Sequence, residues 1–205
     1  MTDDTTVEQL MLDVEFGCSI VSEPFGRNID IILSDLQTAH GAAFVTLLKE
    51  ITNHPAYSAL KTDPSIYTIG GESGEDYDNL LNAARNAVEH GYRVFILPNP
   101  KGFRTADFVF ERKGVYKMFD LKTISGKSSA SNRLLESVGQ TNRVLLNMAV
   151  VYNPVALARN IKSYFEKNPY AIEVLIFKGH KIISVLREDV ESNTFHNIFI
   201  AKYIK

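Results

Sequence analysis

The sequence predicts an α/β (α+β) fold: a central mixed β-sheet with a β-hairpin that carries the candidate site, flanked by helices, plus an N-terminal helical extension. From residue 75 onward, segments with helix and strand periodicity follow one another in the order α-β-β-β-α-β-α-β-β, which is typical of a mixed sheet covered by helices. The dipeptide Lys113-Gly114 lies between two β-prone segments and predicts the hairpin. With 205 residues, 45% of them hydrophobic, the chain can bury a sizeable core.

Residues 1–72 are expected to form a mixed, partly helical, acidic extension. Apolar residues recur at helical spacing after Ser34 and Asp35, either of which would cap a helix that ends before Pro55. The expected elements are a helix over residues 35–52, a short helix to residue 60 and a strand over residues 66–69. The glycine-rich segment Gly70–Gly74 favours a boundary, which leaves residues 73–205 as a basic α/β domain.

The second domain is expected to begin with an amphipathic helix over residues 75–90, which Gly91 ends in the usual position after the last turn. The expected strands cover residues 92–97, 106–112, 115–124, 143–150, 171–177 and 181–186. A short helix is expected from the Ser/Gly-rich loop to about residue 140, and a longer one over residues 154–167, with Pro154 near its first turn. Residues 197–204 of the tail have a strand-like pattern.

The composition excludes several classes of protein. No apolar segment approaches the roughly 20 residues needed to cross a bilayer, and the acidic start of the chain is unlike a signal peptide. The lone Cys18 cannot form an internal disulfide, which fits a reducing compartment. The five histidines are scattered, and no Cys/His spacing suits a structural zinc site.

The net charge of −2 conceals two halves of opposite sign. Residues 1–90 hold 4 Lys and Arg against 15 Asp and Glu, a balance of −11. Residues 91–205 hold 18 against 9, a balance of +9, and the two balances sum to −2. A basic half favours a polyanionic partner such as nucleic acid. The alternative is that both charged surfaces only keep the protein in solution.

The side chains that could take part in catalysis lie on the predicted hairpin. Asp120 and Lys122 are separated by one residue, so both side chains point to the same face of their strand. If the hairpin turns at Lys113-Gly114, paired residue numbers sum to about 227, which places Asp107 almost opposite Asp120. Two carboxylates and one ammonium group should therefore converge at one end of the sheet.

Such a group of charges needs an explanation, because opposed carboxylates repel each other. A divalent cation held by Asp107 and Asp120 would turn this repulsion into binding energy, and hard oxygen ligands favour Mg²⁺ or Mn²⁺, with Zn²⁺ as a third candidate. Lys122 would then orient a water molecule or neutralise charge in a phosphoryl transition state. The alternative is a surface hairpin with solvated polar residues.

Several polar residues after this strand are candidate substrate-binding groups. The loop and the start of the following helix offer hydroxyls, backbone amides and a cation for a phosphate. The candidates are Ser129, Ser131, Asn132, Arg133 and Gln140. Glu89, in the preceding helix, is a candidate third carboxylate, although an exposed helix glutamate is the competing interpretation.

These residues resemble the signature of the PD-(D/E)XK nucleases. Ala106-Asp107, a hairpin and then Asp120-Leu121-Lys122 match its order and spacing, and the helix and strand that follow also match. More widely, residues 91–187 resemble the C-terminal tRNase domains of contact-dependent growth inhibition toxins and related polymorphic toxins of bacteria. Two positions depart from the signature: Ala106 replaces its proline, and Asp120 replaces the commoner glutamate.

The resemblance implies a metal-dependent nuclease that cleaves RNA, with tRNA as the expected substrate and Asp107, Asp120 and Lys122 as catalytic residues. It also implies a toxin that acts in the cytoplasm after delivery and is neutralised by an immunity protein. Some toxin tRNases of similar layout belong to a barnase- and colicin-like group that needs no metal. In that case Lys122 and the polar loop would act on the phosphate directly.

Two other classes of function stay open from the sequence. One is a non-catalytic module of a phage or mobile element that binds nucleic acid or protein. The other is a domain that binds a protein partner through its acidic N-terminal part, which could also cover the basic site of the same chain. The initial methionine favours a free-standing protein over the tail of a larger toxin.

Overall fold

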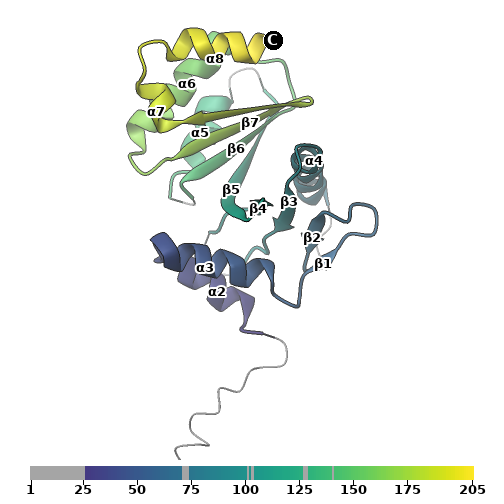
Figure 1. The fold of residues 1–205 in the computed structure, drawn as a ribbon. Coiled ribbons are helices and arrows are strands. Elements are labelled where there is room, and N and C mark those ends of the chain that lie inside the picture. Colours follow the sequence, from purple (N-terminus) through teal and green to yellow (C-terminus); the bar gives the residue numbers. More distant parts are fainter. Residues whose placement is uncertain (1–25, 71–73, 101, 103, 127–128, 140) are drawn as a thin grey trace, which may run out of the picture.

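The computed structural model describes residues 26–70, 74–100, 102, 104–126, 129–139 and 141–205. Among these residues, eight strands form one mixed sheet in the sequence order β1 to β8 (Figure 1). The strands are β1 (Ser58–Ala59), β2 (Ile66–Thr68), β3 (Arg93–Ile96), β4 (Phe108–Arg112), β5 (Val115–Ile124), β6 (Arg143–Met148), β7 (Glu173–Lys178) and β8 (Lys181–Leu186). The helices are α2 (Ile29–Leu36), α3 (Gly41–Thr52), α4 (Glu75–Glu89), α5 (Ala130–Glu136), α6 (Pro154–Lys167), α7 (Arg187–Glu191) and α8 (Phe195–Ile204).

Strand β5 is the central element of the sheet because it has a different neighbour along each half. Its first half pairs antiparallel with β4, from Arg112 opposite Val115 to Phe108 opposite Phe119. Its second half pairs in parallel with β6, beginning with Asp120. The sheet thus divides at β5 into a β1–β4 half and a β6–β8 half.

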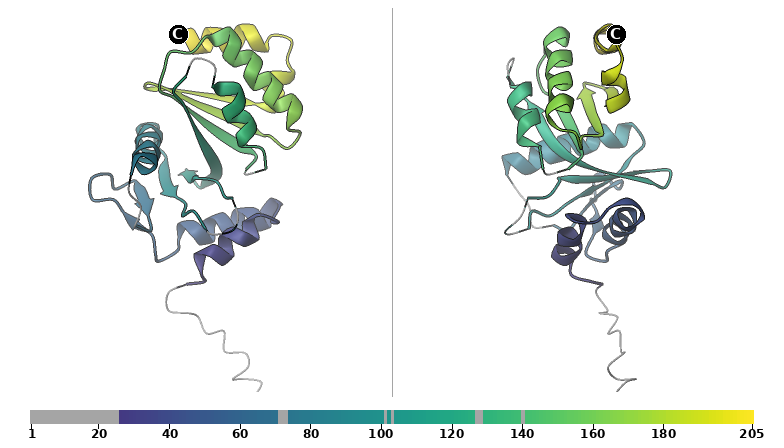
Figure 2. Two further views of the ribbon diagram at one scale, coloured as in Figure 1. Left: turned by 180° about the vertical axis from the view of Figure 1, so that it is seen from behind. Right: turned by 90° about the vertical axis from the view of Figure 1, so that its left-hand side faces the viewer.

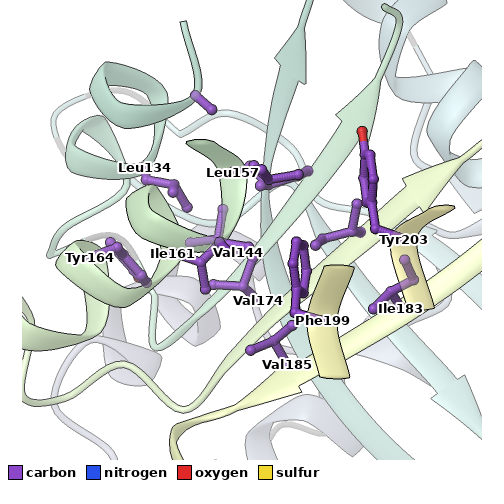
Figure 3. Packing of buried hydrophobic residues seen from close by; sticks show 14 of the residues in the cluster. Leu134, Val144, Leu157, Ile161, Tyr164, Val174, Ile183, Val185, Phe199 and Tyr203 are labelled. Atoms are coloured by element: carbon purple, nitrogen blue, oxygen red, sulfur yellow. The ribbon is translucent and has the colours of Figure 1, made fainter. Parts of the chain in front are cut away.

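Helices cover the two halves from different sides (Figures 1 and 2). Helices α5, α6 and α8 pack on one face of β5–β8 and enclose the largest apolar cluster, which Figure 3 shows with Val144, Ile161 and Phe199 at its centre. Helix α4 covers the opposite face of the sheet. Helices α2 and α3 pack on β3, β4 and the start of β5, on the side away from α4.

The sheet architecture and its order of elements are confirmed. The predicted hairpin turns at Lys113 and Gly114, both with positive φ (53° and 79°), as a two-residue turn requires. The register is also confirmed, because every β4–β5 pair has residue numbers that sum to 227. Helix α6 begins at Pro154 as predicted, and the side chain of Asn153 accepts a hydrogen bond from the amide of Ala156.

Three predictions about local structure are wrong. The single helix over residues 35–52 is two helices, and Asn28, not Ser34 or Asp35, caps the first of them. The short helix to residue 60 is replaced by turns and strand β1. The strand-like tail is helix α8, because its aromatic residues recur every four positions and pack on α6 and the sheet: Phe195, Phe199 and Tyr203.

The N-terminal segment contributes to the sheet and to one of its cores. Strand β2 pairs in parallel with β3, and β1 pairs antiparallel with β2. Buried residues of α2 and α3 share a cluster with Phe95 of β3, Val109 of β4 and Met118 of β5. The proposed boundary between residues 72 and 73 stays a prediction. In the described part of the chain, no helix is long and apolar enough to cross a membrane.

Candidate functional site

The candidate site lies where β5 changes its neighbour. Residues with even numbers on β5 share one face, on which Met118 packs under α2 and α3 and Ile124 packs under α5 and α6. Asp120 and Lys122 lie between these two apolar contacts along the strand. The alternation of the strand therefore places two ionisable groups between two cores.

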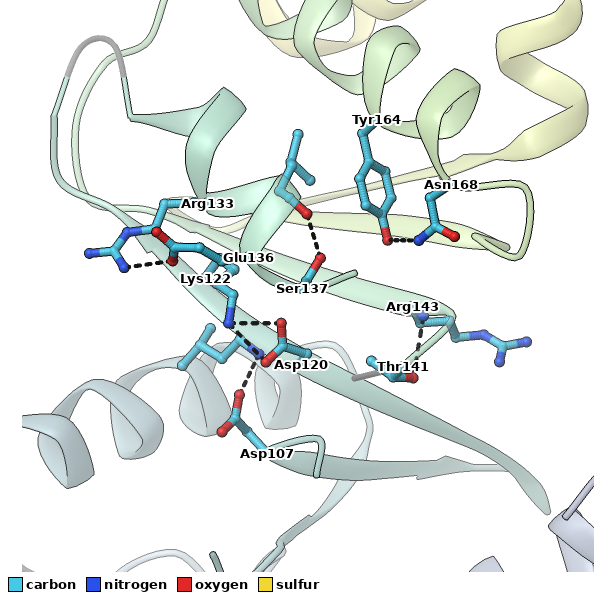
Figure 4. Close-up of polar contacts among 12 residues, drawn as sticks. Asp107, Asp120, Lys122, Arg133, Glu136, Ser137, Thr141, Arg143, Tyr164 and Asn168 are labelled. Carbon is cyan, nitrogen blue, oxygen red and sulfur yellow. Dashed lines mark hydrogen bonds and ion pairs between the residues drawn. The ribbon is translucent and has the colours of Figure 1, made fainter. Parts of the chain in front are cut away.

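Asp107 reaches this site from the residue before β4. Its backbone amide donates to the carbonyl of Phe119 (3.0 Å), and its Oδ2 accepts a hydrogen bond of 2.6 Å from the amide of Leu121 (Figure 4). These two bonds fix Asp107 beside Asp120. The predicted proximity of the two aspartates is therefore found in the structure.

Lys122 and Asp120 form an ion pair that is largely removed from solvent. The Lys122 Nζ atom lies 3.0 Å from Oδ1 and 2.9 Å from Oδ2 of Asp120 (Figure 4). The exposed fractions of the two side chains are 14% and 2%. Asp120 Oδ2 has this ion pair but no hydrogen bond of good geometry among the described residues. The ammonium group is thus paired with buried Asp120, and half-buried Asp107 lies beside this pair.

The site holds more negative charge than Lys122 can balance. Burial and, second, the adjacent Asp120 carboxylate raise the pKa of Asp107 to about 7, although the Leu121 hydrogen bond and the Lys122 ammonium group oppose this rise. Burial also raises the pKa of Asp120, although Lys122 opposes this effect. A second cation at this position would relieve the repulsion.

The three side chains lie at the wall of an open cleft of about 830 Å³. Its remaining walls are the start of α4, the segment between β3 and β4, and helix α5. The other lining residues are Asp76, Asn79, Leu80, Leu97, Pro98, Asn99, Arg104, Thr105, Ala106, Leu121, Thr123, Arg133 and Glu136. The lining contains four carboxyl groups and three cationic groups, so the cleft itself does not carry the basic balance of the C-terminal half.

The polar residues predicted after β5 have different positions. Arg133 lines the cleft, where its Nη1 lies 2.9 Å from Oε2 of Glu136 (Figure 4). Ser129 precedes α5, and its hydroxyl donates to the carbonyl of Gly126. Ser131 and Asn132 follow in the first turn of α5 and do not belong to the described lining. The prediction for Gln140 lies outside the described residues.

Glu89 is not a third carboxylate of the cleft, because it lies at the far end of α4, with its Oε2 2.9 Å from Nδ1 of His180. The structure adds three charged residues that sequence reasoning missed: Asp76, Arg104 and Glu136. Asp76 is in the first turn of α4, at the other end of this helix from Glu89. Glu136 carries a weak sequence signal, its i, i+3 spacing from Arg133.

The comparisons with known proteins give little independent information. No protein-family model matches the chain, and no curated protein matches it. A chain of the CdiA-CT/CdiI toxin and immunity complex from Burkholderia pseudomallei is similar in structure over 57% of this chain and 92% of that chain. The sequence identity is 20% and the TM-score is 0.39.

Proposed function

We propose that the chain is a nuclease that cleaves phosphodiester bonds in the cleft beside Asp107, Asp120 and Lys122. One observation carries the proposal: two carboxyl groups and an ammonium group meet, mostly buried, at the wall of an open polar cleft. Lys122 is paired with Asp120, so Asp107 has no ion pair among the described residues. Strongly perturbed carboxyl groups in a cleft are typical of functional sites.

A divalent cation fits the donor set of this site. Asp107 and Asp120 would hold it through hard oxygen atoms, and it would offset the burial and the adjacent Asp120 charge that raise the pKa of Asp107. In the described part of the chain, no cluster of three or more His, Cys, Asp or Glu side chains could hold a metal. Two carboxylates with water and substrate phosphate in the other positions are usual for Mg²⁺. When bound, the cation would supply Lewis-acid polarisation of the phosphate and an acidified water.

The residues of the chain have separate roles in this proposal. Lys122, which one carboxylate holds in place, stabilises the negative charge that develops on the phosphate oxygens. Asp107, whose Oδ2 accepts a hydrogen bond from the Leu121 amide, would hold the cation as a carboxylate beside Asp120, and it takes up a proton only when no cation is bound. Arg133 lies on the α5 wall, within reach of a neighbouring phosphate once it leaves Glu136.

A metal-independent route uses the same residues. Asp107 would accept a proton from the attacking hydroxyl of an RNA substrate, and Lys122 would neutralise the phosphate. The excess carboxylate favours the metal-dependent route, because a polyanion gains little attraction from a cleft with four carboxyl groups and three cations.

The test is a cleavage assay with the purified protein. Total tRNA, mRNA and plasmid DNA are incubated with Mg²⁺, Mn²⁺, Zn²⁺ or EDTA, and the wild-type protein is compared with Asp120→Asn and Lys122→Met. Cleavage that both substitutions abolish supports the nuclease, and loss of cleavage in EDTA supports the metal-dependent route. If no nucleic acid is cut under any of these conditions, the protein is a binding module instead.

A matched control for these variants exists on the same strand. Lys117 of β5 forms an ion pair of 2.8 Å with buried Glu173, outside the cleft. Lys117→Met also removes a lysine paired with a buried carboxylate, although Lys117 is more exposed than Lys122 (31% against 14%) and Arg143 stays 3.3 Å from Glu173, so this variant should keep its cleavage activity. The narrower predictions rest on the sequence resemblance: tRNA as the substrate, action as a delivered toxin, and an immunity protein as partner. A screen of individual tRNAs would test the first of them.

A further inference from the structure

Arg104 differs from the other cationic residues of the cleft. Lys122 is paired with Asp120, and Arg133 is paired with Glu136. Arg104 lines the same cleft with an exposed side chain, and among the described residues its guanidinium has no hydrogen bond or ion pair. It can therefore bind an anion without first losing a partner, which the other two cations cannot do.

The backbone of Arg104 is fixed although its side chain is free. Its carbonyl oxygen accepts a hydrogen bond of 3.0 Å from Nε2 of Gln37, the residue that ends α2. Two buried residues, Leu97 and Ala106, lie on either side of this segment in the sequence and pack in the apolar cluster with α2 and α3. The N-terminal helices thus support the wall of the cleft that carries Arg104.

We infer that Arg104 is a substrate-binding residue for a backbone phosphate of the nucleic acid, and that Gln37 is the positioning residue that holds it over the cleft. This inference rests on the proposed function and names the part of the site that holds the substrate. An arginine forms two parallel hydrogen bonds to a phosphate, which fix the orientation of the phosphate and also add affinity. A phosphate next to the one that is cleaved would lie between Arg104 and the Asp107–Asp120 pair.

The inference also gives residues 29–52 a function. Helices α2 and α3 contribute no side chain to the described lining of the cleft, yet α2 bonds directly to the segment that forms its wall. Their contribution to substrate binding would be indirect, through the position of Arg104.

Binding is measured without cleavage, so that the result does not depend on the nuclease. A fluorescein-labelled 2′-O-methyl RNA and a DNA of the same sequence are titrated in Ca²⁺, and the fluorescence anisotropy gives Kd. Arg104→Gln should raise Kd about 10-fold and reduce the slope of log Kd against log salt concentration by about one, which is the loss of one ionic contact. Arg104→Lys should restore part of the affinity. Arg159→Gln, an exposed arginine on α6 outside the cleft, is the matched control and should leave Kd unchanged.

Gln37 is tested in the same assay. Gln37→Ala should weaken Kd about 3-fold with an unchanged Tm, whereas Thr38→Ala, which removes a hydrogen bond within the end of α2, should not change Kd. In a cleavage assay, Arg104→Gln should raise KM and change kcat by less than about 2-fold, since it acts on binding.

The outcomes separate this inference from the proposed function. Binding that depends on Arg104 without any cleavage supports the inference and overturns the nuclease. Cleavage with equal KM for the wild type and Arg104→Gln overturns the inference and leaves the nuclease intact. Equal losses of affinity in Arg104→Gln and Arg159→Gln also overturn it, because only net charge would then matter.

Discussion

The backbone amide of Leu121 donates a hydrogen bond of 2.6 Å to Oδ2 of Asp107, at the point where β5 has lost β4 as a neighbour. A carboxylate thus accepts the hydrogen bond that the backbone of an adjacent strand would otherwise accept. The bond holds Asp107 next to Asp120, and it favours the charged form of Asp107 although burial opposes that form. The hydrogen bond and burial therefore shift the pKa of Asp107 in opposite directions, and their balance sets how the stability of the protein depends on pH.

Without a divalent cation, the protein should lose stability as the pH rises from about 4 to about 7. The folded-state pKa of Asp107 is raised to about 7 from its ordinary value of 3.8. Between these values the native state binds more protons than the unfolded state, so the free energy of unfolding falls with rising pH, by roughly 1 to 4 kcal/mol. Urea denaturation in EDTA at several pH values measures this change in the free energy of unfolding. A flat profile would contradict the raised pKa.

Asp107→Asn should remove the part of this pH dependence that Asp107 causes. The amide oxygen can still accept the hydrogen bond from Leu121, while the buried charge is lost. At pH 8 in EDTA, we expect the variant to have a higher Tm than the wild type, by about 2 to 4 °C for each kcal/mol gained. Addition of Mg²⁺ or Mn²⁺ should raise the Tm of the wild type and not that of the variant. Equal shifts in both proteins would place the cation elsewhere.

Lys122→Met should destabilise the fold by about 3 kcal/mol at pH 8 in EDTA, because it leaves buried Asp120 without its cation. The double variant with Asp120→Asn should be more stable than the Lys122→Met variant, since no unpaired buried charge remains. Equilibrium unfolding of the four proteins gives the coupling energy in a double-mutant cycle. Additive losses would show that the two side chains do not interact in solution.

Part of this site could be predicted because the hairpin register is simple arithmetic. A two-residue turn at Lys113-Gly114 fixes which residues pair, so the proximity of Asp107 and Asp120 followed from the turn alone. The Arg104 wall could not be predicted, because its position depends on α2 through a contact 67 residues apart in the sequence.

The C-terminal tail shows a second reason why secondary structure could not be predicted from the sequence. Phe195, Phe199 and Tyr203 recur at helical spacing, but further apolar residues lie between them, so the pattern has no single apolar side and packing on α6 favours the helix. The predicted helix over residues 35–52 failed for a related reason. Its apolar residues do have helical spacing, but the chain breaks after Leu36 and begins a new helix at Gly41, which has a positive φ of 59°.

The N-terminal helices should unfold together with the rest of the sheet. Leu48 of α3 is fully buried in the cluster that also contains residues of β3, β4 and β5. Leu48→Ala should therefore lower the free energy of unfolding by about 3 kcal/mol, with one transition seen by both circular dichroism and tyrosine fluorescence. Val45→Ala, on the exposed side of the same helix, should change it by less than about 0.5 kcal/mol. Two separate transitions, of which Leu48→Ala shifts only the first, would make residues 26–52 an independent unit. In that case α2 could not hold the Arg104 segment under conditions in which the sheet alone is folded.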